Sequence, residues 1–200
     1  MTKTHPLQNR VHPDGSIQAV PARGTLMGNR GGRLHLPDGT LGPARWRTAQ
    51  WIICQLTFRD RQREVMGPGY TELFFLDEPT ALAAGHRPCF ECRHDAAMEF
   101  ARRWTWPDGP RARAAEMDRV LHSERRAKRS RAPLRTLPPG AMALDGETVW
   151  AQHSDGPLIW SFEGYRRGTA PTKPLEVLTP PATMRALRAG YEPLWHPSAG

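Results

Sequence analysis

The stretch YTELFFLDEPTALAAGHRPCFECRHDAAMEFARRW, residues 70–104, decides the predicted fold. Its apolar run over residues 72–76 predicts a short buried strand. Asp77 follows as the cap of a helix predicted over residues 78–84, with a proline in the first turn and Gly85 as the left-handed stop. The strand and the short helix are the best-defined local elements of the chain, so we expect them at the centre of the molecule.

The rest of the chain predicts many short elements. Twenty prolines and eighteen glycines among 200 residues place much of the backbone in turns, while 38% hydrophobic residues suffice for a core. We predict an α+β fold with a short mixed or antiparallel sheet, a Cys-x-x-Cys helix knuckle and a β-rich C-terminal lobe. Residues 1–136 form the knuckle-containing α+β domain with a basic helix over 111–129, and residues 137–200 form the small lobe packed on it.

The predicted strands and turns follow from alternation and from turn residues. Residues 13–15, Pro-Asp-Gly, predict a hairpin turn. Alternation from residue 52 to 58 predicts a strand with one buried side. The C-terminal lobe is predicted to contain strands at 140–144, 148–152, 158–162 and 175–178, and a helix at 182–189.

Two segments share an order of features. Residues 73–88 and 176–193 each run through a strand, a cap, a proline, an alanine-rich helix and a glycine stop. This order is consistent with a duplicated strand-helix unit, but the same capping signals are common at helix ends, and we favour that explanation.

A net charge of +8, mostly from arginine, makes nucleic acid the first partner to consider, although an arginine-rich genome also produces such a count. No apolar run reaches membrane-spanning length, and the N-terminus MTKTHPLQNR lacks an apolar signal core. We expect a cytoplasmic protein without a membrane partner; the sequence does not indicate its oligomeric state.

The three cysteines favour metal or redox use over a disulfide scaffold. Cys89 and Cys92 open the helix that follows residue 88, where the helix N-terminus favours their thiolates. Zinc needs four ligands, and a second cysteine pair at standard spacing is missing. His35 and His94 are the predicted further ligands.

Two other residues near the pair are considered and set aside. Cys54 alternates in phase with Ile52 and Leu56, which is typical of an ordinary core residue. His86 precedes the pair and is expected to be an exposed residue at a helix end.

Two basic segments are candidate nucleic-acid contacts. The glycine-rich segment 22–35 can turn its backbone N–H groups inward around an anion, although a plain turn is equally compatible with it. The run ERRAKRSRAPLR from residue 124 has no apolar periodicity, and a solvated, mobile chain is its other interpretation. The predicted contacts from both segments are Arg30, Arg33, Arg125, Arg126, Lys128, Arg129 and Arg131.

Residues 73–93, and above all ALAAGHRPCFECR at 81–93, resemble the second half of the metal-binding domain of bacterial Ada alkylation-response proteins. In that family the Cys-x-x-Cys pair supplies two of four cysteine ligands to a zinc that sits against DNA. Only Cys89 and Cys92 carry over. The upstream pair, which includes the methyl-accepting cysteine, has no counterpart here, so the resemblance implies a zinc site and does not imply methyl transfer.

Three functions are compatible with these features. The first is a nucleic-acid-binding protein with a zinc-knuckle-like site. The second is a metal-dependent hydrolase or nuclease, for which His122 and Glu124 are the candidate acid and base. The third is a non-enzymatic interaction module with a structural or degenerate knuckle.

Two further interpretations of the cysteine pair fit less well. A thioredoxin-like motif needs a different order of elements around it. In zinc deaminases the His-x-Glu precedes the cysteines, whereas here it follows them at residues 122–124.

Overall fold

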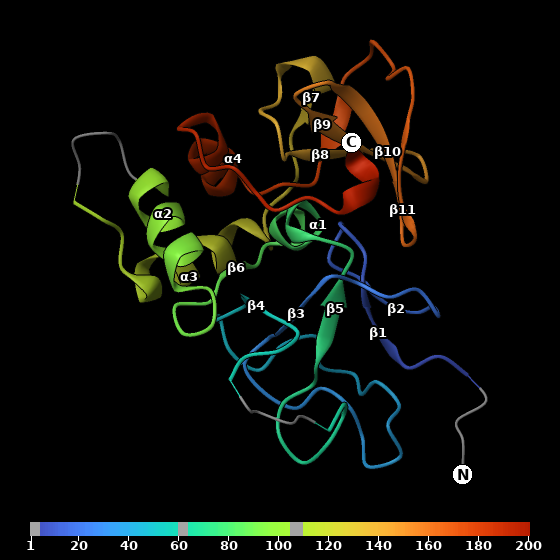
Figure 1. Cartoon of the computed structure of the whole chain (residues 1–200), viewed down its shortest axis with the longest axis vertical. Coiled ribbons are helices and arrows are strands. Elements are labelled where there is room, and N and C mark those ends of the chain that lie inside the picture. Colours follow the sequence, from blue (N-terminus) through green and yellow to red (C-terminus); the bar gives the residue numbers. More distant parts are fainter. Residues whose placement is uncertain (1–4, 60–63, 105–109) are drawn as a thin grey trace.

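The structure is a computed structural model that describes residues 5–59, 64–104 and 110–200. In these residues the chain forms a mixed α+β fold with two six-stranded sheets and four α-helices (Figure 1). The predicted α+β class and the β-rich C-terminal part are confirmed. The predicted domain boundary after residue 136 stays a prediction, and one strand from before it belongs to the second sheet.

The first sheet is mixed and has the strand order β2-β1-β5-β3-β4-β6. The pairs β1–β5 and β4–β6 are parallel, and the others are antiparallel. The predicted hairpin turn joins β1 to β2, where Gly15 adopts a φ of +91°. The strands are β1 (Gln8–Val11), β2 (Ile17–Ala19), β3 (Leu26–Asn29), β4 (Ile52–Cys54), β5 (Leu73–Phe75) and β6 (Arg87–Pro88).

The second sheet is antiparallel throughout and has the order β11-β10-β9-β8-β12-β7. Four of its strands lie at the predicted segments, while β7 and β11 were not predicted. The strands are β7 (Arg131–Ala132), β8 (Met142–Asp145), β9 (Thr148–His153), β10 (Gly156–Ser161), β11 (Gly164–Arg167) and β12 (Leu175–Val177).

The helices are α1 (Glu78–Ala83), α2 (His94–Trp104), α3 (Ala114–Glu124) and α4 (Pro181–Arg188), with short 3-10 turns η1 (Leu134–Thr136) and η2 (Pro197–Ala199). The start and stop of α1 are as predicted. Asp77 accepts a 3.0 Å hydrogen bond from the Thr80 N–H, and Gly85 adopts a φ of +81°. Helix α3 is shorter at both ends than the helix predicted over residues 111–129.

Helix α1 connects the two sheets and lies at the centre of Figure 1. Its Thr80 hydroxyl accepts a 2.9 Å hydrogen bond from Trp160 Nε1 of the second sheet. Its Glu78 carboxylate accepts bonds from the Tyr191 hydroxyl at 2.6 Å and from the Leu194 N–H at 2.8 Å. Because α1 directly follows β5 of the first sheet, these contacts fix the C-terminal segment and the second sheet against the first.

The two segments with a shared order of features also end in the same way. After α1, the His86 N–H bonds the Ala81 carbonyl, and after α4, the Tyr191 N–H bonds the Ala186 carbonyl, each at 3.0 Å. Gly85, which follows α1, and Gly190, which follows α4, both have a positive φ. The similarity of the two helix ends is confirmed, whereas the predicted cap is found only at α1, because the N-cap residue of α4 is Pro180 and provides no side-chain cap. A duplication stays a prediction.

Among the described helices, none is long and apolar enough to cross a membrane. The cytoplasmic location stays a prediction.

Candidate metal centre

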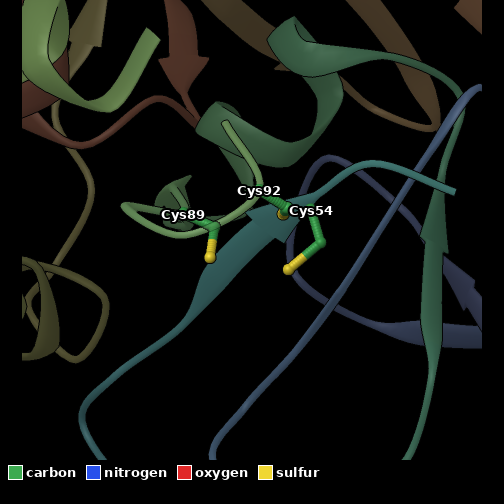
Figure 2. Close-up of side chains that lie close together, drawn as sticks. All are labelled: Cys54, Cys89 and Cys92. Atoms are coloured by element: carbon green, nitrogen blue, oxygen red, sulfur yellow. The ribbon is translucent and has the colours of Figure 1, made fainter. Parts of the chain in front are cut away.

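The three cysteines of the chain meet at one point. The sulfur atoms of Cys54, Cys89 and Cys92 all lie within 4.8 Å of one another, and each residue is at most 7% exposed. Figure 2 shows the three side chains gathered at the end of β4. Among the described residues, these cysteines are the one group of three or more histidine, cysteine or acidic side chains close enough to share a metal ion.

Strand pairing brings Cys54 to the pair. Strand β4 runs parallel to β6, with Ile52 opposite Arg87 and Ile53 opposite Pro88. The Cys89 N–H continues this pairing with a 2.9 Å bond to the Ile53 carbonyl. The last residue of β4 is therefore placed beside the first residue after β6.

The turn between β6 and α2 carries the other two sulfurs. Cys89 and Cys92 precede α2, which begins at His94, so they lie in a turn ahead of the helix and not within its first turn. The Arg93 N–H bonds the Cys89 carbonyl at 3.0 Å, which folds Cys92 back toward Cys89. The knuckle-on-helix arrangement predicted from the sequence is thus not confirmed in that detail.

Two buried ion pairs hold this turn at its ends. Arg87 binds both carboxylate oxygens of Asp118 on α3 at 2.8 Å, and Arg93 binds both oxygens of Glu78 on α1 at 2.8 Å. Bidentate arginine–carboxylate pairs fix orientation as well as distance. The cysteine turn is therefore anchored to two helices on either side.

The cluster has an apolar shell and polar contacts to the sulfurs. Met27 lies opposite Cys54 on β3 and is buried in the same cluster, with Phe58 and Phe74 packed against it. Backbone N–H groups reach two of the sulfurs: that of Glu91 lies 3.4 Å from Cys89 Sγ, and that of Gln55 bonds Cys92. Hydrogen bonds to sulfur and exclusion of water are the surroundings that stabilise a metal thiolate.

The thiols shift one another's pKa values. Hydrogen bonds with Cys89 and Cys92 raise the pKa of Cys54, while the bond with Cys54 lowers the pKa of Cys89. The hydrogen bond with Cys54 lowers the pKa of Cys92. The hydrogen bond with Cys89 and burial raise this pKa by more, so the net shift is upward. Three adjacent thiolates repel one another, so full ionisation of the group requires a cation among them.

The two histidines predicted as ligands lie outside the cysteine group. His35 is buried, and its ring nitrogens contact the Thr71 hydroxyl at 2.7 Å and the Gly67 carbonyl at 3.2 Å. His94 is exposed, and its Nδ1 lies 3.1 Å from the Phe90 carbonyl. Their role as ligands stays a prediction with no support from their positions.

Sequence reasoning missed Cys54 as a member of the site and misplaced His86. Alternation correctly indicated that Cys54 faces the interior, but the interior at that point is the cysteine cluster. His86 was expected to be exposed and is fully buried, because the Gly85 turn directs it against Trp51 and Phe75 at centroid distances of 5.0 and 4.7 Å. Burial, followed by the charge of Arg30, keeps its pKa well below the usual histidine value.

The chain was also compared with known proteins. No family model, no curated protein and no solved structure matches it.

The two candidate acid–base residues have structural contacts. The Glu124 carboxylate accepts bonds of 3.0 and 3.2 Å from the Ala182 N–H at the start of α4. The His122 ring lies 5.8 Å from the Trp46 ring, edge to face, and its Nδ1 is 3.4 Å from Arg125. Their participation in a reaction stays a prediction.

The seven predicted nucleic-acid contacts fall into two groups. Arg30 is buried and Arg125 is half-buried, and both line the same pocket. The other five are exposed: Arg33, Arg126, Lys128, Arg129 and Arg131. Of these five, Arg129 forms a 2.9 Å ion pair with Glu176.

Proposed function

We propose that Cys54, Cys89 and Cys92 bind one zinc ion in a knuckle-like centre, and that the protein binds nucleic acid. The observation that carries the first part is the convergence of three sulfurs from two separate elements within 4.8 Å. Sulfur ligands around a tetrahedral zinc lie about 3.8 Å apart, as follows from a Zn–S bond of about 2.3 Å. A small inward movement of the side chains therefore suffices for coordination.

The chemistry of the donors favours a soft or borderline ion. Thiolates select zinc, copper(I) and iron–sulfur clusters over magnesium or calcium. Three thiolates leave one position of a tetrahedral zinc for a fourth ligand. The resemblance of residues 81–93 to the Ada-type domain supports zinc, with Cys54 supplying one thiolate from upstream of the pair.

The ion stabilises the contact between β4 and the β6–α2 turn, because its ligands come from both. The ion therefore contributes to the stability of the fold, whatever ligand takes its fourth position. It would explain why a polar cluster is tolerated beneath an apolar shell.

Metal analysis of the purified protein tests the proposal. We expect one zinc per chain and, after exchange with cobalt(II), the sulfur-to-cobalt charge-transfer band of a thiolate site. Because the chain has three cysteines in all, a thiol reagent counts the site directly. It should label three thiols only after chelation.

Variants separate the ligands from their neighbours. Cys54→Ser should lose the metal, whereas His35→Gln and His94→Gln should retain it and so act as matched controls. Absence of zinc in freshly purified protein, or full metal content in Cys54→Ser, would overturn the proposal.

The nucleic-acid part rests on the net charge of +8 and on the exposed cations of residues 126–131. Binding through phosphates falls steeply with salt, and each lost phosphate contact reduces the slope of log K against log salt by about 0.9 on duplex DNA. The double variant Arg126→Gln/Lys128→Gln should reduce it by nearly two. Arg135→Gln, an exposed arginine on η1, is the control. No binding at low salt, or equal slopes in all variants, would contradict this part.

A further inference from the structure

A pocket of about 240 Å³ lies between the two sheets, against the C-terminal end of α1. We call it the arginine pocket. Its wall carries five cationic side chains, two tryptophans and two carboxylates. The cations are Arg30, Arg45, Arg125, Lys128 and Arg129; the tryptophans are Trp46 and Trp51; the carboxylates are Asp14 and Glu124.

Arg30 brings a charge into this wall without a directly paired carboxylate, and the more distant charge of Asp14 offsets only part of it. The Arg30 side chain is 1% exposed and donates to His86 Nε2 at 3.3 Å and to the carbonyls of Gly15 and Arg45 at 2.9 and 3.4 Å. Among the described residues, no carboxylate lies within ion-pairing distance of it. A buried charge that is bonded only to neutral acceptors is unfavourable unless something compensates it.

Arg125 adds a second such charge. Its Nη atoms donate to the Gly85 carbonyl at 2.6 Å and the Ala49 carbonyl at 2.8 Å, and its buried Nε lacks an acceptor in the described part of the chain. The guanidinium carbons of Arg30 and Arg125 lie 3.9 and 4.1 Å from the centre of the Trp51 ring. Burial lowers the pKa of both, and for Arg30 the charge of Arg125 lowers it further.

The two carboxylates of the wall are already engaged. Asp14 contacts the His12 ring at 3.0 Å and accepts a 2.7 Å bond from the Ser16 N–H. Glu124 caps α4 at Ala182. Arg129 is paired with Glu176, outside the wall, at 2.9 Å. The other four cations of the pocket still outnumber the available anions, and a bound anion would restore the balance.

Trp46 gives the pocket a flat aromatic surface at its edge. The side chain is 42% exposed, and its ring centre lies 6.2 Å from that of Trp51. Exposed tryptophans beside a cationic groove are the surfaces on which nucleic-acid bases stack.

We propose that the arginine pocket binds the phosphate and the base of a nucleotide. The phosphate lies against the cations of the wall, and the base stacks on Trp46. The pocket volume of about 240 Å³ leaves room for a phosphate and its sugar, with the base at the rim. A free nucleotide and the end of a single strand offer this same chemistry.

Titration with adenosine 5′-monophosphate tests the pocket, with calorimetry and tryptophan fluorescence as readouts. We expect one saturable site, and binding of adenosine or inorganic phosphate weaker by about tenfold or more, since each lacks one of the two contacts. No saturable binding at low salt would overturn the proposal.

A matched pair of variants excludes non-specific attraction. Lys128 and Arg135 are both exposed, but only Lys128 lines the pocket. Lys128→Gln and Trp46→Leu should each weaken nucleotide binding severalfold, and Arg135→Gln should leave it unchanged. Equal losses in Lys128→Gln and Arg135→Gln would refute a defined pocket.

Oligonucleotides with and without a 5′-phosphate distinguish the two sources. A phosphorylated strand that binds more tightly than the mononucleotide, and loses this advantage without its phosphate, assigns the pocket to strand ends. Tighter binding of the mononucleotide assigns it to free nucleotides. The pocket shares Lys128 and Arg129 with the proposed nucleic-acid surface and rests in part on that proposed function. Strand binding in the absence of mononucleotide binding overturns the pocket and leaves nucleic-acid binding intact.

Discussion

Replacing Cys54 with alanine should abolish the stabilisation of the fold by metal. Cys54 ends β4, and the other two sulfurs lie in the β6–α2 turn, so an ion bound to all three links these elements. A ligand that binds only the folded state stabilises it by RT ln(1 + [L]/Kd), which is about 2.7 kcal/mol at a free zinc concentration one hundred times Kd.

This free energy converts to a measurable shift in Tm. In a chain of this length, 1 kcal/mol corresponds to roughly 2–4 °C, so zinc should raise the Tm of the wild-type protein by about 5–11 °C over the chelated protein. Loss of the buried sulfur also costs about 1 kcal/mol through packing, with or without metal. The two effects are separated by measuring each variant in both states.

The assay is thermal unfolding followed by circular dichroism, with and without chelator. Cys54→Ala should unfold at the same temperature in both states, slightly below the chelated wild type. Met27→Leu changes a residue of the same buried cluster and leaves the three cysteines in place, so it should keep the full zinc-dependent shift in Tm. A wild-type Tm that is the same with zinc and with chelator, or a zinc-dependent Tm shift of equal size in Cys54→Ala, would refute the reasoning.

Three further substitutions test residues that stabilise the fold around the site. Glu78→Ala leaves a buried guanidinium unpaired and should lower the free energy of unfolding in urea by about 3–5 kcal/mol, whereas Glu99→Ala, on the exposed face of α2, should change it by less than about 1 kcal/mol. Gly85→Ala should destabilise by more than about 1 kcal/mol, because φ is +81° and a Cβ would lie 2.6 Å from an arginine side chain; Gly69→Ala, with open space around it, should be neutral. Burial raises the pKa of Glu124 in the folded protein. The folded state therefore holds this proton more tightly than the unfolded state, and the protein loses stability as pH rises through the raised pKa. Glu124→Gln removes this titration, so the variant should lose less stability than the wild type between pH 4 and pH 7. A wild-type and variant difference that does not change with pH would contradict this.

The segment from the β5 strand to the Gly85 stop could be predicted because all its signals are local. A cap, a proline in the first turn and a glycine stop act within a few residues, and Asp77 forms the bond expected of it. Strands β8, β9 and β10 follow the same rule, since tight turns join them. The rule is not complete, because a tight turn also joins β10 to β11, which was not predicted.

The end of α3 shows where local signals fail. The sequence predicts a helix to residue 129, and the structure ends it at Glu124. Arg125 then turns to the carbonyls of Gly85 and Ala49, and the Val177 N–H bonds the Ser130 carbonyl at 2.9 Å as the chain enters the second sheet. Distant partners, absent from any local pattern, decide this boundary.

Cys54 and Arg30 were misjudged for the same reason. Alternation indicates which side of a strand a residue faces, but not what lies there. The neighbours of Cys54 depend on a parallel pairing between β4 and a two-residue strand more than thirty positions later. Arg30 sits in a glycine-rich segment that suggests an exposed loop, yet it is 1% exposed, because the partners that bury it come from residue 15 and residues 45–51.

Residues 85–92 connect the proposed metal centre to the arginine pocket. At one end the Gly85 carbonyl and the His86 ring accept bonds from Arg125 and Arg30, and at the other end Cys89 and Cys92 supply thiols. Strand β4 also connects the two sites, because Trp51 of the pocket wall directly precedes this strand and Cys54 of the metal centre is its last residue. A change in the backbone here, such as Gly85→Ala, must therefore disturb both sites at once and cannot assign a function to either. Side-chain changes at the far ends, Cys54 for the metal and Lys128 for the pocket, leave the shared backbone in place, and only such changes can show whether the two sites act separately.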